Sequence, residues 1–133
     1  MQIQMGNMSD DQNEAKDKWG HTEAYQIAAQ RTASYTAADW EQIRTEAAEI
    51  YQLFYQHRQT TPDTPVLQQV VERWRVHLER WFYPCDGQML QSLADLYEND
   101  LRFQHNIDKI GGNGTAGTMV SAIRHYMVTP LSD

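Results

Sequence analysis

The chain has 133 residues, of which 41% are hydrophobic and 22% charged, the size and composition of one globular domain. Its formal net charge of −7 at pH 7 argues against nucleic acid as a partner, because phosphates need clustered Lys and Arg. It has no apolar run long enough for a membrane span, no apolar core of a signal peptide, and a single cysteine. Together these features predict a cytoplasmic protein without a membrane partner.

The N-terminal part of the chain is predicted to be weakly structured. Residues 1–13 have no periodicity and few apolar side chains, which predicts a disordered leader. Residues 14–35 have helical character, but their apolar stripe is thin and Gly20 interrupts it. A helix of this kind needs a partner surface to persist, so we interpret residues 14–35 as a marginal N-terminal helical lid.

The helical core is predicted to cover residues 36–129, with a short tail at 130–133. Thr36 and Asp39 form a capping-box pattern that begins a helix ending near His57. Apolar residues recur along it at helical spacing: Trp40, Ile43, Ala47, Ile50, Tyr51 and Phe54. Polar residues fill the opposite face, and they are Glu41, Gln42, Arg44, Glu46 and Glu49.

A second amphipathic helix follows a loop that ends at residue 64. Thr64 or Asp63 caps it, with Pro65 in its first turn, where a missing amide costs nothing. Pro84 requires the helix to stop before it. The residues predicted to be buried are Leu67, Val70, Val71, Trp74, Leu78 and Trp81.

The remaining segments predict three shorter helices. Asp86 is placed to cap the first, and Asn99–Asp100 break it before a second short helix that Gly111–Gly114 terminates. The apolar residues of these three helices are Met89, Leu90, Leu93, Leu96, Tyr97, Leu101, Phe103, Ile107, Met119, Val120, Ile123, Tyr126 and Met127. No strand-like alternation occurs, so the sequence predicts one all-α domain of about five to six helices that cross at angles.

Catalytic and metal sites find little support in the sequence. None of the five histidines has a second His or Cys three or four residues away, so we expect no metal site and no cofactor. We expect His77 to lie at the edge of the core and donate to a backbone carbonyl, with ligand binding as the open alternative. No arrangement of nucleophile and base can be argued from position, and we predict that the chain is not an enzyme.

The corner between the second and third core helices is the most distinctive stretch. Trp81, Phe82 and Tyr83 follow one another, and three consecutive aromatic residues at a helix end cannot all face one side. At least one must line a second surface, for which an apolar pocket is the natural candidate. Cys85 lies at the same corner, where the helix dipole favours a thiolate and Asp86 opposes it; a buried, inert thiol is the default interpretation.

The same stretch, together with several others, resembles a known family. The residues that carry the resemblance are Trp19–Gly20, Arg31 to Thr36, Asp39–Trp40, Trp81 to Cys85, Leu93 to Tyr97, Asp100, Arg102, Phe103, Asn106 to Lys109 and Ala122–Ile123. From about Lys16 to Met127, the sequence is similar to the TipAS antibiotic-recognition domain. This resemblance implies a globin-like helical fold without haem, usually the effector-binding half of MerR-type transcription activators.

The resemblance also implies a ligand. Domains of this family bind bulky apolar antibiotics, including thiopeptides, in a cleft whose N-terminal helices become ordered around the drug. The candidate ligand-binding residues are Trp19, Tyr35, Trp40, Phe82, Tyr83, Cys85, Met89, Tyr97 and Phe103. In thiopeptide binders of the family a cysteine thiol can add to a dehydroalanine of the drug, and Cys85 is the possible point of attachment here.

We therefore expect a non-catalytic domain, monomeric or weakly dimeric, that sequesters or senses an antibiotic-like molecule. The alternative is a structural or protein-interaction module without a small-molecule ligand, in which the same aromatic residues form the core.

Overall fold

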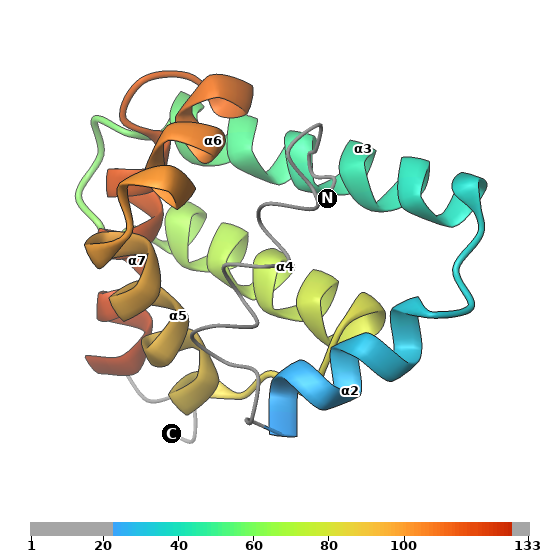
Figure 1. The fold of residues 1–133 in the computed structure, drawn as a ribbon. Coiled ribbons are helices and arrows are strands. Elements are labelled where there is room, and N and C mark those ends of the chain that lie inside the picture. The colour runs from blue at the N-terminus through green and yellow to red at the C-terminus, as the bar shows by residue number, and fades with distance from the viewer. Residues whose placement is uncertain (1–22, 129–133) are drawn as a thin grey trace.

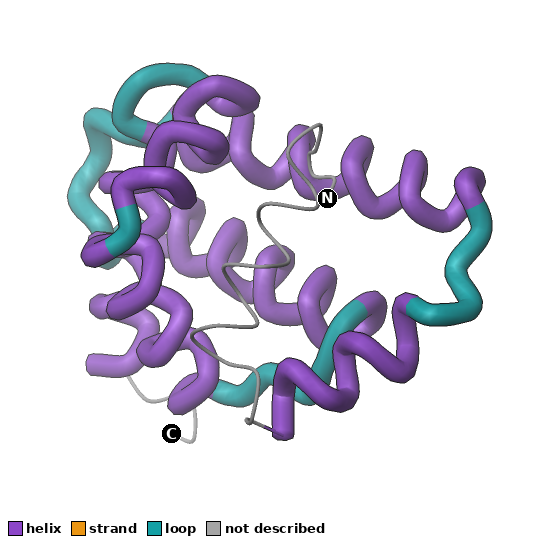
Figure 2. Tube along the Cα trace, viewed as in Figure 1, coloured by secondary structure: helices purple, strands orange, loops and turns teal. Residues whose placement is uncertain are grey.

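The computed structural model describes residues 23–128, and within them the chain forms six helices and no strand (Figures 1 and 2). The helices are α2 (Glu23–Thr32), α3 (Ala37–Gln56), α4 (Pro65–Trp81), α5 (Gly87–Asn99), α6 (Leu101–Gly111) and α7 (Thr115–Val128). The prediction of an all-α domain with about five to six helices is confirmed. The predicted leader, Trp19 and the tail lie outside the described residues.

Helices α3 and α4 run side by side in opposite directions, and α5, α6 and α7 gather at one end of this pair (Figure 1). Helix α7 contacts α3, α4, α5 and α6, which makes it the centre of that end of the fold. Helix α2 lies near the opposite end, where it contacts α4. The helices cross at angles and do not form a parallel bundle, as the sequence predicted and in keeping with a globin-like arrangement.

The helix starts follow the predicted capping residues. At α3 the Thr36 hydroxyl accepts from the Asp39 amide at 3.1 Å, and the Asp39 carboxylate accepts from the Thr36 amide at 3.0 Å. Thr64 caps α4 with Pro65 in the first turn, and Asp86 caps α5. These local hydrogen bonds satisfy amides that have no partner within the helix, which explains why each helix begins where it does.

The turn between α6 and α7 depends on glycine. Gly112 has φ 121° and Gly114 has φ 97°, both in the region that other residues rarely adopt. The Asp108 carboxylate then accepts hydrogen bonds from the amides of Gly114 and Ala116 at 3.4 Å and 2.8 Å. Gly111–Gly114 therefore ends α6 as predicted, and the Asp108 cap lets α7 begin directly after the turn.

The core lies between α3, α4, α5 and α7. Its most deeply buried apolar side chains are Phe54, Leu67, Val71, Leu90, Ala94, Met119, Ala122 and Ile123. Helix α2 contributes no buried residue, in agreement with its thin apolar stripe. Leu101 was expected in an apolar stripe, but at the first position of α6 it is 78% exposed. No helix within residues 23–128 is long and apolar enough to cross a membrane.

Candidate ligand-binding site

Aromatic rings from three parts of the chain meet where α2, α3 and the end of α4 come together. The Tyr35 ring stands edge-on to the rings of Trp40 and Trp81, with 5.7 Å between centroids in each pair. The Trp40 ring lies 6.3 Å from that of Phe82. Trp81 is buried, whereas the other three residues are half-buried. We call Tyr35, Trp40, Trp81 and Phe82 the corner cluster; it unites three of the predicted ligand-binding residues.

The end of α4 separates the three consecutive aromatic residues. The amides of Phe82 and Tyr83 both donate to the Leu78 carbonyl, at 2.8 Å and 3.1 Å, and the chain leaves the helix at Phe82. Trp81 and Tyr83 are consequently buried while Phe82 is half-buried. Phe82 thus differs from its two neighbours, in keeping with the prediction that the three rings cannot all face one side, and its contact with a ligand stays a prediction.

Helix α2 is attached to the C-terminal turn of α4 by polar contacts. The Arg31 guanidinium donates to the Glu79 carbonyl at 2.7 Å, and the Tyr35 hydroxyl donates to the Trp81 carbonyl at 2.5 Å. Carbonyls in the last turn of a helix have no partner within that helix, and a cation there also interacts favourably with the helix dipole. These bonds supplement the packing of the partly buried Ala24, Ile27 and Ala28 against the core.

The other predicted site residues lie in and around the core. Tyr83 and Tyr97 are buried, which raises the pKa of both hydroxyl groups. The Tyr83 ring is 6.3 Å from Phe82, and the Tyr97 ring is 6.0 Å from Phe103. Phe103 and Met89 are half-buried and pack against the core. Tyr83 and Tyr97 therefore form a buried layer next to half-exposed apolar side chains.

Cys85 is part of this buried layer and not of the surface. Its side chain is packed in the core, with 1% of the residue exposed, and burial raises the pKa of the thiol to about 12. Although Arg75 lowers that pKa, Glu79 and Asp86 oppose it. A ligand could reach the sulfur only after the corner between α4 and α5 moved, so covalent attachment at Cys85 stays a prediction.

Next to the corner cluster, the side chains of Glu46, His77 and Trp81 form a polar network that was not predicted from the sequence. The Glu46 Oε1 atom accepts from Trp81 Nε1 at 3.0 Å and lies 2.9 Å from His77 Nδ1. His77 is 4% exposed, and burial lowers its pKa despite the carboxylate beside it. Burial would raise the pKa of Glu46, but hydrogen bonds from Trp81 and His77 lower it.

At neutral pH Glu46 is therefore ionised and His77 neutral, with its proton on Nδ1, because a carboxylate can only accept. The expectation that His77 donates to a backbone carbonyl is wrong: it donates to a side chain of α3. Glu46 itself was assigned to the polar face. It lies three residues after Ile43 and four before Ile50, both buried, so helical spacing could have placed it toward α4.

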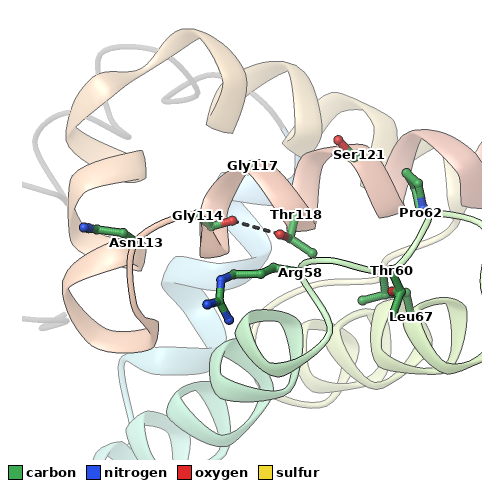
Figure 3. A pocket seen from close by; sticks show the side chains of 9 residues that line it. All are labelled: Arg58, Thr60, Pro62, Leu67, Asn113, Gly114, Gly117, Thr118 and Ser121. Atoms are coloured by element: carbon green, nitrogen blue, oxygen red, sulfur yellow. Dashed lines mark hydrogen bonds between the residues drawn. The ribbon is translucent and has the colours of Figure 1, made fainter.

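Two cavities lie outside the predicted site. One, of about 610 Å³, lies between the loop after α3 and the start of α7 (Figure 3), and its lining residues are Arg58, Thr60, Pro62, Leu67, Asn113, Gly114, Gly117, Thr118 and Ser121. There the Thr118 hydroxyl donates to the Gly114 carbonyl at 2.9 Å (Figure 3). The other, of about 420 Å³, lies between α3 and α4, and its lining residues are Glu46, Glu49, Ile50, Glu72, Arg73, Val76, His77 and Arg80.

None of the predicted ligand-binding residues lines either cavity. Within the part of the chain that the structure describes, no three side chains of His, Cys, Asp or Glu lie together in a way that could hold a metal ion.

Comparisons with known proteins give a consistent result. The family model of the TipAS antibiotic-recognition domain matches residues 12–126. The HTH-type transcriptional activators TipA of Streptomyces coelicolor and Streptomyces lividans are each 31% identical to the chain over 128 residues, which cover 90% of the chain and 51% of the activator. The HTH-type transcriptional activator mta of Bacillus subtilis is 31% identical over 96 residues, 72% of this chain and 37% of that protein. The chain thus spans about half the length of the TipA proteins.

The fold is also shared with a solved structure, that of TipAS from Streptomyces lividans in complex with nosiheptide, a thiopeptide antibiotic. The two chains superpose with a TM-score of 0.73 and are 30% identical, over 92% of this chain and 87% of the other.

Proposed function

This chain belongs to the TipAS antibiotic-recognition domain family, and from that premise we propose that it binds bulky apolar antibiotics of the thiopeptide type without catalysing a reaction on them. The observation that carries the proposal is the corner cluster, whose half-buried rings stand beside a helix with no buried residue of its own. A protein-interaction module would account for the aromatic core, but it would not account for membership in this family. We therefore favour the antibiotic-binding function.

The physical basis of binding is apolar burial. Half-buried aromatic rings leave apolar surface exposed that a ligand can cover. Each Å² of apolar surface removed from water contributes about 25 cal/mol to the free energy of binding. Tyr35, Trp40 and Phe82 supply this area in the corner cluster, and Met89 and Phe103 supply it on α5 and α6. Ordering of the protein around the ligand offsets part of the gain.

The segment around α2 is the part of the site best suited to adapt to different drugs. In this proposal residues 14–35, with Trp19, cover the ligand as a lid over a helical core that spans residues 36–129. The polar contacts to the end of α4 can break and re-form, and α2 packs against the core through partly buried side chains and none that is fully buried. Bulky antibiotics of different shapes could then share one site.

The buried residues have a different proposed role. Tyr83 and Tyr97 support the contact surface from below, and they meet the drug only where the ligand displaces the half-buried side chains above them. Attachment at Cys85 would join the sulfur to the terminal carbon of a dehydroalanine and transfer the thiol proton to the adjacent carbon. That step would also require the corner between α4 and α5 to open.

The biological role that follows is drug sensing or resistance. Relatives of the chain are transcriptional activators, so we propose that this domain serves a MerR-type regulatory system in the cytoplasm, as its drug sensor or by sequestering the drug. The formal net charge of −7 argues against DNA as a partner of this chain itself.

Calorimetric titration of the 133-residue chain with nosiheptide tests the proposal. We expect saturable binding of one drug molecule per chain and recovery of the drug with unchanged mass from any fraction that is not covalently attached. Absence of heat and of any tryptophan fluorescence change, with nosiheptide and with other large apolar antibiotics, would overturn it. Accumulation of a modified free drug would contradict the non-catalytic assignment.

A further inference from the structure

Glu46 lies on the side of α3 that faces α4, where it contacts His77 and Trp81, the latter a member of the corner cluster. We propose that Glu46 is a positioning residue of the antibiotic site, which orients the rings of Trp81 and His77 and thereby fixes the surface that the drug and α2 contact. The inference rests on the proposed function, because it concerns how that same site is held in a binding-competent form. Glu46 acts through these rings and does not touch the ligand.

The first step of the argument is the geometry of the carboxylate. One oxygen, Oε1, accepts from Trp81 Nε1 at 3.0 Å and from His77 Nδ1 at 2.9 Å. The other, Oε2, accepts from Gln42 Nε2 at 3.4 Å and lies 3.5 Å from an Arg80 nitrogen. The contacts of Oε2 are long and exposed, so the carboxylate is held mainly through Oε1, whose two short hydrogen bonds orient the Trp81 and His77 rings.

The second step is what those two rings support. The Trp81 ring packs edge-on against Tyr35, and the Trp81 carbonyl accepts the Tyr35 hydroxyl. The His77 ring stands edge-on to Phe82 at 6.3 Å and is stacked on Trp74 at 5.3 Å. Two of the predicted ligand-binding residues, Tyr35 and Phe82, therefore rest on rings that one oxygen atom orients.

The third step concerns what happens without the carboxylate. Trp81 and His77 are buried, and each would keep a ring N–H without its acceptor. Because a buried donor without a partner is unfavourable, the rings would turn toward water or another acceptor. Tyr35 and Phe82 would lose their supports, and α2 would lose the surface on which it docks. Truncation of Glu46 is therefore expected to affect α2 and ligand affinity far more than the core.

Neighbouring residues on the same helix provide a matched control. Glu49 lies on α3 three residues after Glu46, and its side chain is 62% exposed and 3.9 Å from Arg73. Glu49→Gln therefore removes one negative charge close to Glu46 without touching the Trp81 and His77 rings. Glu46→Gln removes the same charge at the site but keeps an oxygen that can accept from both rings.

The experiment measures two quantities on the 133-residue chain. Calorimetry gives the affinity for nosiheptide, and amide hydrogen exchange without the drug gives the protection of each helix. For Glu46→Ala we expect at least tenfold weaker binding and faster exchange in α2 (Glu23–Thr32), with α5 and α7 as protected as in the wild type. Glu46→Gln should bind within threefold, and Glu49→Gln within twofold, of the wild type.

Trp81→Phe is a second variant, which removes the indole donor and leaves Glu46 in place. Like Glu46→Ala, Trp81→Phe should bind nosiheptide more weakly and exchange faster in α2. If Glu46→Ala does not fold, Trp81→Phe is the variant that tests the proposal. Wild-type affinity in either variant, or a loss of protection spread equally over α2, α5 and α7, would overturn the positioning role alone. Absence of nosiheptide binding by the wild-type chain would overturn the proposed function together with this inference.

Discussion

The hydroxyl of Tyr35 donates a 2.5 Å hydrogen bond to the backbone carbonyl of Trp81, which joins the turn after α2 to the last turn of α4. The two residues are 46 positions apart in sequence, and their rings also meet edge-on. One residue of the predicted ligand contact surface thus helps to attach α2. In the proposed site, a drug that contacts Tyr35 would therefore also act on the position of α2.

Replacement of Tyr35 by Phe tests that attachment. The ring contacts with Trp40 and Trp81 remain, but the Trp81 carbonyl loses its donor, at a cost of about 1 kcal/mol. We expect amide exchange in α2 to become about fivefold faster, which is what about 1 kcal/mol of local stability implies. Tyr55→Phe is the control, since Tyr55 holds Arg58 over its ring face and Phe keeps that contact. Equal exchange in α2 for both variants would count against the attachment.

Substitution of Phe82 by Ala tests the ligand contact surface. Phe82 is half-buried against Trp40 and Tyr83, so its loss removes apolar area without opening the deepest part of the core. We expect calorimetry to show nosiheptide binding weakened by ten- to a hundredfold, which is about 1.4–2.7 kcal/mol. Val76→Ala is the control, because Val76 is 46% exposed on α4 and is not a predicted contact. Equal losses in the two variants would place the drug elsewhere.

Much of the fold could be predicted because its signals are local. Thr36, Thr64 and Asp86 each accept a hydrogen bond from the amide three residues further on. Gly112 and Gly114 allow the positive φ angles that the turn between α6 and α7 requires. The α2 segment was also predicted to be weak, since a thin apolar stripe is a property of the segment itself. Signals of this kind need no knowledge of which helices pack together.

The parts that could not be predicted depend on packing between distant segments. Glu46 was assigned to the polar face by residue type, although its partners His77 and Trp81 lie 31 and 35 positions away on another helix. Cys85 was weighed between a reactive, ligand-facing thiol and a buried, inert one, and its burial depends on how the chain leaves α4. Sequence pattern places a residue on a face, but only the pairing of helices shows what that face meets.

The thiol of Cys85 should be unreactive in the native protein. A pKa raised from 9.0 to about 12 lowers the thiolate fraction at pH 8 by about a thousandfold, and the core also shields the sulfur. We expect alkylation by iodoacetamide to be at least a hundredfold slower in native conditions than in urea, as followed by intact mass. Comparable rates in the two conditions would show that the corner between α4 and α5 opens readily without a ligand.

The same mass measurement tests covalent attachment. A mass increase equal to one nosiheptide in the wild type, absent from Cys85→Ser, would confirm the prediction made for Cys85. An unchanged mass after binding is complete would contradict it and leave the thiol a core residue.

The buried His77 should make stability depend on pH between neutral and mildly acidic conditions. Burial lowers its pKa below the ordinary value of about 6.5, so the unfolded chain takes up a proton at a pH where the native histidine stays neutral. The contribution of His77 to the free energy of unfolding is therefore fully present above about pH 6.5. It decreases as the pH falls from there toward the pKa of His77 in the native protein. Among the charged groups that face the ring, Glu46 opposes the shift and Arg80 adds to it.

Urea denaturation at pH 7.5, 6.5 and 5.5 measures this effect, with His77→Gln as the comparison because its amide can still donate to Glu46 but does not titrate. The free energy of unfolding should fall more steeply with decreasing pH in the wild type than in the variant. Glu46 does not interfere in this window, because its pKa is lowered from an ordinary value of 4.5 that is already below the pH range measured. Parallel pH profiles for the two proteins would mean that His77 accepts a proton in the folded state as easily as in the unfolded chain, and that the Glu46 contact outweighs its burial.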